Sequence, residues 1–128
     1  MNDLYRSMFL PDLLIAALGR NRDRPAVFID GDVLTAAHFR DEISRYLQVF
    51  REQGVVQGDG VATLSKNRPE VLCSMGAVMI GGCRNTPLHP LGSLDDHAYV
   101  VEDAEISTLI FDRASRRARA SCASACPV

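Results

Sequence analysis

The feature that most constrains the fold is a strand–helix–strand pattern between residues 58 and 90. An apolar run at residues 61–64 follows a glycine-rich turn and suits a strand that is buried on both faces of a parallel sheet. Asn67 is placed to cap the next helix, Pro69 suits its first turn, and Glu70 complements the positive helix end. The pattern predicts a β-α-β unit with a right-handed crossover.

The alternation continues beyond this unit. The first helix ends at Gly81-Gly82, and a second strand leads to Pro90. Ser93, with an acid three residues later, approximates a capping box for another helix. The apolar side of that helix is expected at Leu94, Ala98 and Val101. Residues 106–111 are apolar almost throughout and predict a third strand, again buried on both faces.

The N-terminal part predicts a different arrangement. Residues 12–18 form a short amphipathic helix, and residues 26–34 form a hairpin whose tight turn is Asp30–Asp32. Thr35 caps a long helix that ends at Gly54. The apolar face of this helix is Ala36, Phe39, Ile43, Leu47 and Phe50. The expected fold class is α/β, with an N-terminal hairpin and helix followed by a β-α-β-α-β parallel unit.

The order of these motifs resembles the opening of AMP-forming acyl-CoA synthetases, the fatty-acid–CoA ligase group of the adenylate-forming enzymes. The resemblance covers residues 26–112. No single tripeptide is specific to the family, so the resemblance rests on the order of the whole set of motifs. The matching residues are Gly58-Asp59, Asn67-Arg68-Pro69-Glu70, Gly81-Gly82, Pro87-Leu88-His89-Pro90, Glu102-Asp103-Ala104 and Asp112. The resemblance implies that residues 1–112 are an incomplete piece of the large N-terminal domain of these enzymes.

For the complete family enzyme, the resemblance implies the use of ATP, Mg²⁺ and CoA on a fatty acid or another carboxylate. The family holds the ATP phosphates with a loop that reads approximately Thr-Ser-Gly-Thr-Thr-Gly-x-Pro-Lys-Gly, and this sequence does not contain that loop. The later acidic residues and the C-terminal lid with its lysine are also absent. The sequence therefore predicts no catalytic, cofactor-binding or metal-binding residue in this chain, and no cofactor bound by the chain alone.

Residues 113–128 break the pattern. They contain five Ala, four Arg and three Ser but no large apolar side chain, so we expect this tail to be disordered. The family continues here with an amphipathic helix, and we therefore expect the reading frame or the gene to be interrupted after Asp112. Arg116, Arg117 and Arg119 are interpreted as solvated charges rather than an anion-binding surface.

Other residues that could carry chemistry have simpler interpretations. His89 follows a strand end, where ligand sites of open α/β sheets gather, but a turn role is commoner for such a residue. His38 and His97 fall on predicted helices and are expected at the surface or its boundary. Lys66, at a strand end without a glycine-rich loop, is expected to be exposed.

The sulfur-containing residues and the glycine turn also have simpler structural interpretations. Met75 and Met79 lie one helical turn apart and are interpreted as core filling. Cys122 and Cys126 have the spacing of half a metal site, but no partner pair lies near them in the sequence. The turn at residues 58–60 begins a Gly-x-Gly motif, yet it precedes a strand and lacks the third glycine, so dinucleotide binding is not expected.

Composition places further limits on function. The chain has 128 residues, 47% of them apolar, and a net charge of −2, which does not favour binding to nucleic acid or to an anionic membrane. The apolar stretch at residues 8–18 is interrupted by Pro11 and Asp12 and is too short for a transmembrane helix. The four cysteines of the chain form no disulfide framework, and a cytoplasmic location with reduced thiols is expected.

Three functions remain open. The leading hypothesis is a truncated fatty-acid–CoA ligase, whose family activates a carboxylate to an acyl-adenylate and transfers it to CoA, with this piece inactive alone. The alternative is a non-enzymatic interaction module that pairs with a separately encoded remainder and requires a partner for its open sheet edge. A free-standing nucleotide-binding domain is the third, weakened by the missing phosphate loop. Because the sheet is incomplete, self-association through exposed apolar surface is also expected.

Overall fold

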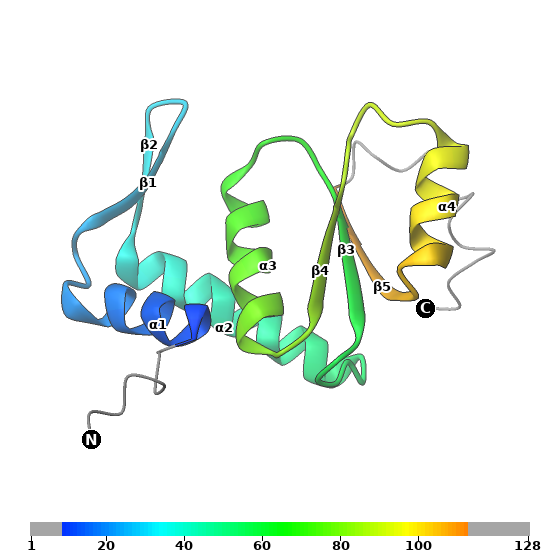
Figure 1. Ribbon diagram of the computed structural model, residues 1–128. Coiled ribbons are helices and arrows are strands. Elements are labelled where there is room, and N and C mark those ends of the chain that lie inside the picture. Colours follow the sequence, from blue (N-terminus) through cyan, green and yellow to red (C-terminus); the bar gives the residue numbers. More distant parts are fainter. Residues whose placement is uncertain (1–8, 113–128) are drawn as a thin grey trace, which may run out of the picture.

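The structure is a computed structural model that describes residues 9–112 (Figure 1). The elements are α1 (Leu10–Arg20), β1 (Pro25–Ile29), β2 (Asp32–Thr35), α2 (Ala36–Glu52), β3 (Gly60–Leu64), α3 (Pro69–Ile80), β4 (Arg84–Leu88), α4 (Leu94–Asp103) and β5 (Ile106–Phe111). The strands β1 and β2 are antiparallel, and the other three form a parallel sheet in the order β4-β3-β5. The predicted α/β class and element order are confirmed, whereas the predicted tail lies outside the described residues.

The hairpin turns where the sequence predicts it. Ile29 pairs with Asp32, so the loop has two residues, Asp30 and Gly31, with φ values of 48° and 87°. Positive φ at both positions is the type I′ geometry that matches the twist of the flanking strands. Figure 1 shows this hairpin standing apart from the parallel sheet.

Helices cover both faces of the parallel sheet, with α3 on one side and α4 on the other (Figure 1). The chain leaves β3 through α3 to reach β4, and then crosses back through α4 to β5 on the far side of β3. The chain therefore moves first to one side of β3 and then to the other. The topological switch point, where open α/β sheets bind ligands at the carboxyl ends of their strands, lies between β3 and β5.

Two apolar cores lie on opposite sides of the sheet. The first joins the sheet to α1, α2 and α3 through the buried residues Leu18, Ala36, Ile43, Phe50, Val61, Cys73, Ala77 and Val78. The second lies under α4 and contains Ala62, Leu64, Leu88, Val101 and Ile106. Gly76 allows the helices of the first core to approach closely, since a Cβ there would lie 2.8 Å from Ile43 Cδ1 and 3.3 Å from Leu14 Cδ2.

The predicted burial of the strands is right for β3 and wrong for β5. All five residues of β3 are buried, as expected for the central strand. In β5 only Ile106 is buried and Ser107 is exposed, because this strand lies at an edge of the sheet. The other edge is β4, where Pro87 is tolerated because the outer side of an edge strand needs no ladder hydrogen bonds.

The helix ends agree with the sequence at three points and differ at one. Thr35 and Ser93 cap α2 and α4 through their side chains, and Ser93 forms the predicted capping box with Asp96. Gly81 is the C-cap of α3. The N-cap of α3 is Arg68 and has no side-chain cap hydrogen bond, so the predicted Asn67 cap is wrong. The helix begins at Pro69, one residue too late for Asn67 to occupy the cap position.

Candidate functional site

A cavity of about 350 Å³ lies at the carboxyl ends of β3 and β5, beside the start of α3. This is the topological switch point of the sheet. Ten residues line the cavity: Tyr46, Thr63, Ser65, Arg68, Glu70, Val71, Ser74, Ile110, Phe111 and Asp112. Its volume falls within the range of small-molecule sites.

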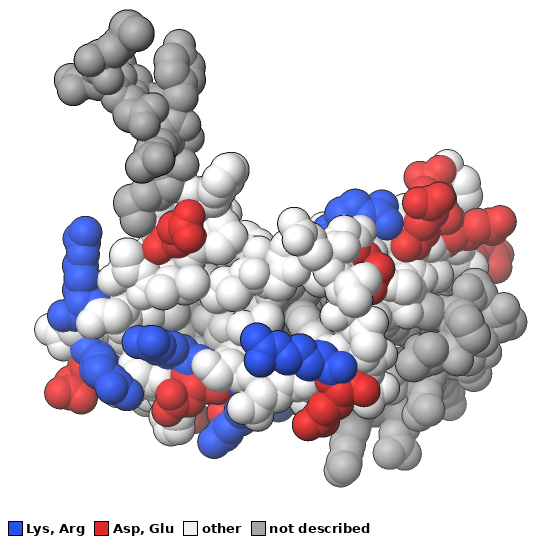
Figure 2. Space-filling view, turned by 90° about the horizontal axis from the view of Figure 1, so that it is seen from below, with Lys and Arg blue, Asp and Glu red and all other residues white. Residues whose placement is uncertain are grey.

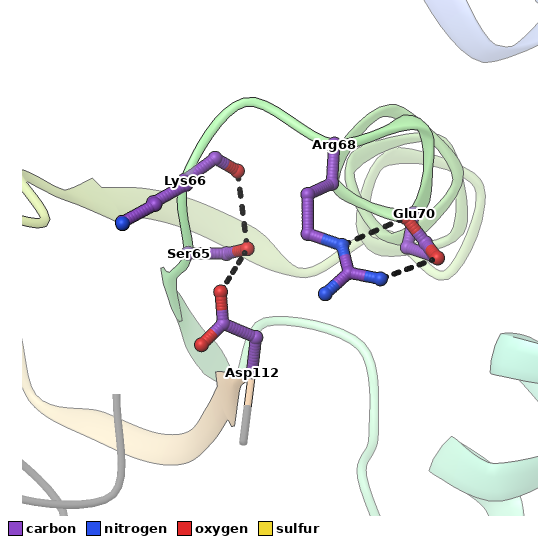
Figure 3. Close-up of polar contacts among 5 residues, drawn as sticks. All are labelled: Ser65, Lys66, Arg68, Glu70 and Asp112. Carbon is purple, nitrogen blue, oxygen red and sulfur yellow. Dashed lines mark hydrogen bonds and ion pairs between the residues drawn. The ribbon is translucent and has the colours of Figure 1, made fainter. Parts of the chain in front are cut away.

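Two polar pairs stand at this end of the sheet (Figure 3). Ser65 Oγ donates to Asp112 Oδ2 at 3.1 Å and joins the turn after β3 to the end of β5. The guanidinium of Arg68 donates to the Glu70 carboxylate at 3.3 and 3.4 Å along the first turn of α3. Lys66 extends to the opposite side from Arg68 (Figure 3) and forms no ion pair with another residue of the range 9–112.

One buried hydroxyl in the cavity lining has no hydrogen-bond partner among residues 9–112. Thr63 is only 6% exposed, and its Oγ1 makes no hydrogen bond with the described part of the chain. Ser74, which is fully buried on α3, donates its hydroxyl to Val71 O at 2.9 Å. A buried hydroxyl without a hydrogen-bond partner costs free energy. Thr63 is therefore the described lining residue whose hydroxyl still needs a partner.

Aromatic and charged groups complete the lining. Tyr46 projects from α2 and is partly buried, and this burial raises the pKa of its phenol, with the charge of Cys73 adding to the effect. The cavity residues carry two carboxylates, Glu70 and Asp112, and one guanidinium, Arg68. The lining therefore has a formal charge of −1 and does not favour an anion.

The described residues contain no cluster of three or more His, Cys, Asp or Glu side chains that could hold a metal ion. Acidic and basic side chains alternate over the face shown in Figure 2, with acidic groups gathered toward one end. Among the described helices, none is long and apolar enough to cross a membrane.

The three histidines differ in their burial. His89 is exposed in the turn after β4, where its Nδ1 accepts from Leu91 N at 3.2 Å, as expected for a turn residue. His38 is exposed on α2, as predicted. The prediction for His97 is wrong: it is 4% exposed, and its Nε2 lies 2.8 Å from His89 O. The buried side of α4 is formed by His97 and Val101, whereas Leu94 is largely exposed.

The remaining candidates are not among the residues that line the cavity. Lys66 is exposed, as predicted. Met75 and Met79 are not core residues, because they share the less covered side of α3 with the exposed Leu72 and belong to neither buried cluster. The cysteine pair at residues 122 and 126 and the arginines at 116, 117 and 119 lie outside the described residues.

Sequence reasoning did not identify the cavity. Thr63 and Ser65 are two residues apart at the end of β3, so their side chains lie on the same face. The strand register pairs Thr63 with Ile110, and one step beyond the ladder it places Ser65 beside Asp112. The usable signal was the placement of polar residues directly after two apolar strands that become neighbours at a switch point.

Comparison with known proteins identifies the family. The model of the AMP-binding enzyme family matches residues 15–127. The chain is 50% identical over 100 residues to the medium/long-chain-fatty-acid–CoA ligase FadD8 of Mycobacterium tuberculosis. That match covers 78% of this chain and 18% of the ligase, so the chain spans about a fifth of its relative's length.

Solved structures show the same fold. A putative long-chain-fatty-acid CoA ligase from Rhodopseudomonas palustris superposes with a TM-score of 0.86 at 26% identity, over 95% of this chain and 31% of that one. A benzoate CoA ligase from Burkholderia xenovorans superposes with a TM-score of 0.82 at 12% identity, over 89% of this chain and 23% of that one. The predicted resemblance is confirmed, and the chain belongs to the AMP-binding enzyme family of adenylate-forming ligases.

Proposed function

We propose that this chain forms the first part of the large domain of a fatty-acid–CoA ligase. The complete enzyme would activate a fatty acid with ATP and Mg²⁺ to an acyl-adenylate and then transfer the acyl group to CoA. The observation that carries this proposal is the 50% identity to the mycobacterial ligase over 100 residues. A cytoplasmic location belongs to the same proposal.

By itself the chain is proposed to be inactive. Adenylation depends on groups that stabilise the charge of the reacting phosphates, and no glycine- and hydroxyl-rich loop with a lysine is present among the 128 residues. The test is to mix the purified chain with ATP, Mg²⁺, CoA and fatty acids of several lengths, and to measure pyrophosphate and acyl-CoA. The expected result is no product above a protein-free blank. Reproducible turnover by the chain alone would contradict the proposal.

Whether this chain is a working segment of a ligase can be tested separately from whether the chain alone is inactive. A chimera in which residues 15–112 replace the corresponding segment of the 50% identical mycobacterial ligase would be assayed for acyl-CoA formation. We expect activity of the chimera, because the replaced segment carries the same fold as the corresponding part of solved ligases. A matched chimera with Gly76→Leu should lose activity, since the new side chain would collide with Ile43 and Leu14.

The alternative proposal is a non-enzymatic interaction module that pairs with a separately encoded remainder. It is favoured by the edge strand β4 of the described sheet and by a directly paired, exposed apolar couple in the hairpin, Phe28 and Val33. The chain alone is then expected to self-associate and to elute larger than a monomer on gel filtration. A Phe28→Lys, Val33→Thr variant should shift elution toward the monomer, and unchanged elution of this variant would show that the hairpin couple is not the contact.

A further inference from the structure

We propose that two copies of this chain dimerise by pairing the open edges of their β1 strands, so that the two hairpins form one continuous antiparallel sheet. Each hairpin is a two-stranded sheet, and β1 has no strand on its outer side among residues 9–112 (Figure 1). A two-stranded hairpin alone is marginally stable, and an open edge is a template for pairing with another chain. The inference rests on the self-association proposed for the interaction-module alternative, to which it gives a specific contact, and it does not depend on ligase activity.

The backbone of Phe28 is directed toward this open edge. Ile29 and Asp32 flank the two-residue turn and are its hydrogen-bonded pair. The next pair, Phe28 and Val33, is therefore a non-hydrogen-bonded pair, whose N–H and C=O groups point away from the other strand of the hairpin. Two antiparallel β1 strands can then meet with Phe28 opposite Phe28 of the second copy and exchange two hydrogen bonds there.

The side chains at this position favour the same register. Phe28 is 72% exposed and Val33 is 49% exposed, and the two residues are paired directly across the hairpin. Leu34, which alternates to the opposite face, packs against the first core, so the face of Phe28 and Val33 is the outer one. The proposed pairing brings the two Phe28 rings together and continues one apolar row across both hairpins. Cross-strand aromatic pairs of this kind stabilise a sheet.

The charges around β1 favour a second copy of this chain in antiparallel orientation. No residue of β1 (Pro25–Ile29) is charged, whereas Arg24 precedes the strand and Asp30 follows it. Both are exposed, and neither forms an ion pair with another residue of the range 9–112. In an antiparallel dimer, Arg24 of each copy lies at the turn of the other, within reach of Asp30, and two-fold symmetry makes this contact twice. Parallel pairing would instead bring like charges together.

The open edge of β2 is less suited to this pairing. β2 leads directly into α2, because Ala36 begins the helix immediately after Thr35. A strand added beside β2 would therefore meet the helix at the end of the ladder. β2 also begins with Asp32, and a charged residue on an edge strand opposes pairing.

The first experiment uses the unaltered full chain. Sedimentation velocity over a concentration series should show a weak monomer–dimer equilibrium, because the contact is small. Amide exchange measured by NMR should become about tenfold slower at Phe28 when the chain is mostly dimeric, since this N–H gains a hydrogen-bond partner. The Val33 amide is the matched control: it points to the edge of β2 and should exchange at the same rate at low and high concentration.

The second experiment reverses the charges. Arg24→Glu and Asp30→Lys, each alone, should weaken dimerisation about fivefold to thirtyfold, because two exposed attractive pairs become repulsive. An equimolar mixture of the two variants should dimerise within about threefold of the wild-type affinity, because each reversed side chain meets an opposite charge in the mixed dimer. Arg40→Glu makes the same charge change at an exposed position of α2 and should leave dimerisation unchanged.

Four results would each overturn the proposal. They are a chain that stays monomeric at every concentration, Phe28 exchange that does not depend on concentration, equal slowing at Phe28 and Val33, and a mixture of the charge variants that dimerises no better than either alone. The exchange measurements use the unaltered chain, so they do not depend on whether a variant folds. A monomeric chain would leave the ligase assays and pairing with a separately encoded remainder unaffected, so this inference fails separately from either proposed function.

Discussion

Arg84 Nη1 donates to Ala104 O at 3.0 Å, and this contact joins the start of β4 to the end of α4. The same guanidinium donates to Gly58 O at 3.1 Å and to Glu105 O at 3.3 Å. One side chain thus ties the segments that precede β3 and β5 to β4. These three carbonyls lie outside the described sheet ladders, so the guanidinium supplies hydrogen-bond partners that the strands do not.

Replacing Arg84 with Met should lower the free energy of unfolding by about 1–3 kcal/mol, because three charge-assisted hydrogen bonds are lost from a partly exposed side chain. Urea denaturation followed by circular dichroism measures the change. Arg68→Met is the matched control: it removes one exposed pair with Glu70 and should cost less than about 1 kcal/mol. Equal effects of the two substitutions would show that Arg84 does not act as a tie.

Gly60→Ala should destabilise the sheet by about 1–3 kcal/mol through steric overlap. A Cβ at this position would lie 2.6 Å from Glu105 O, a backbone atom that cannot turn away. Gly19→Ala is the control, because no atom lies within 4 Å of its Cβ and alanine favours a helix by about 0.5 kcal/mol. Thermal melts of both variants test the difference, and a neutral Gly60→Ala would contradict the close approach of β3 and the β5 segment.

Asp96 should make stability depend on acid pH. The hydrogen bonds from the Ser93 hydroxyl and backbone N–H lower the pKa of the Asp96 carboxyl below its usual 3.8. A lowered folded-state pKa stabilises the fold fully above the unfolded value, and this contribution is lost as the pH falls below 3.8. The difference in stability between wild type and Asp96→Asn should therefore shrink from pH 6 toward pH 3. A constant difference over that range would argue against the capping box.

The two described cysteines should differ in reactivity. Burial, with the charges of Glu42 and Glu70 adding, raises the pKa of the Cys73 thiol to about 11, and this residue is 1% exposed. Burial also raises the pKa of the Cys83 thiol, with the charge of Asp59 adding, but Cys83 is only partly buried. Iodoacetamide at pH 8 should therefore label Cys83 well before Cys73, as read by peptide mass mapping. Cys73 should react only when urea unfolds the chain, and equal native rates would contradict its burial.

The sequence by itself determined the elements whose causes are local. A two-residue loop needs positive φ at both positions, and Asp30-Gly31 supplies it. Pro69 at the start of α3 and Gly81 at its end fix that helix within one residue. The Ser93 capping box also needs only residues three apart. The ordered set of these signals was enough to indicate the family.

Only the tertiary structure decided which surfaces are covered. Residues 61–64 and 106–111 read alike as apolar strands, yet β3 is central and fully buried while β5 lies at an edge. His97 became buried because α4 packs the side that carries it and Val101 against the sheet, with the His89 carbonyl in reach of its ring. The Ser65–Asp112 contact joins residues 47 positions apart. Strand order, and therefore edge, core and cavity, depends on contacts between distant segments, and local patterns carry no information about which strand becomes the neighbour of which.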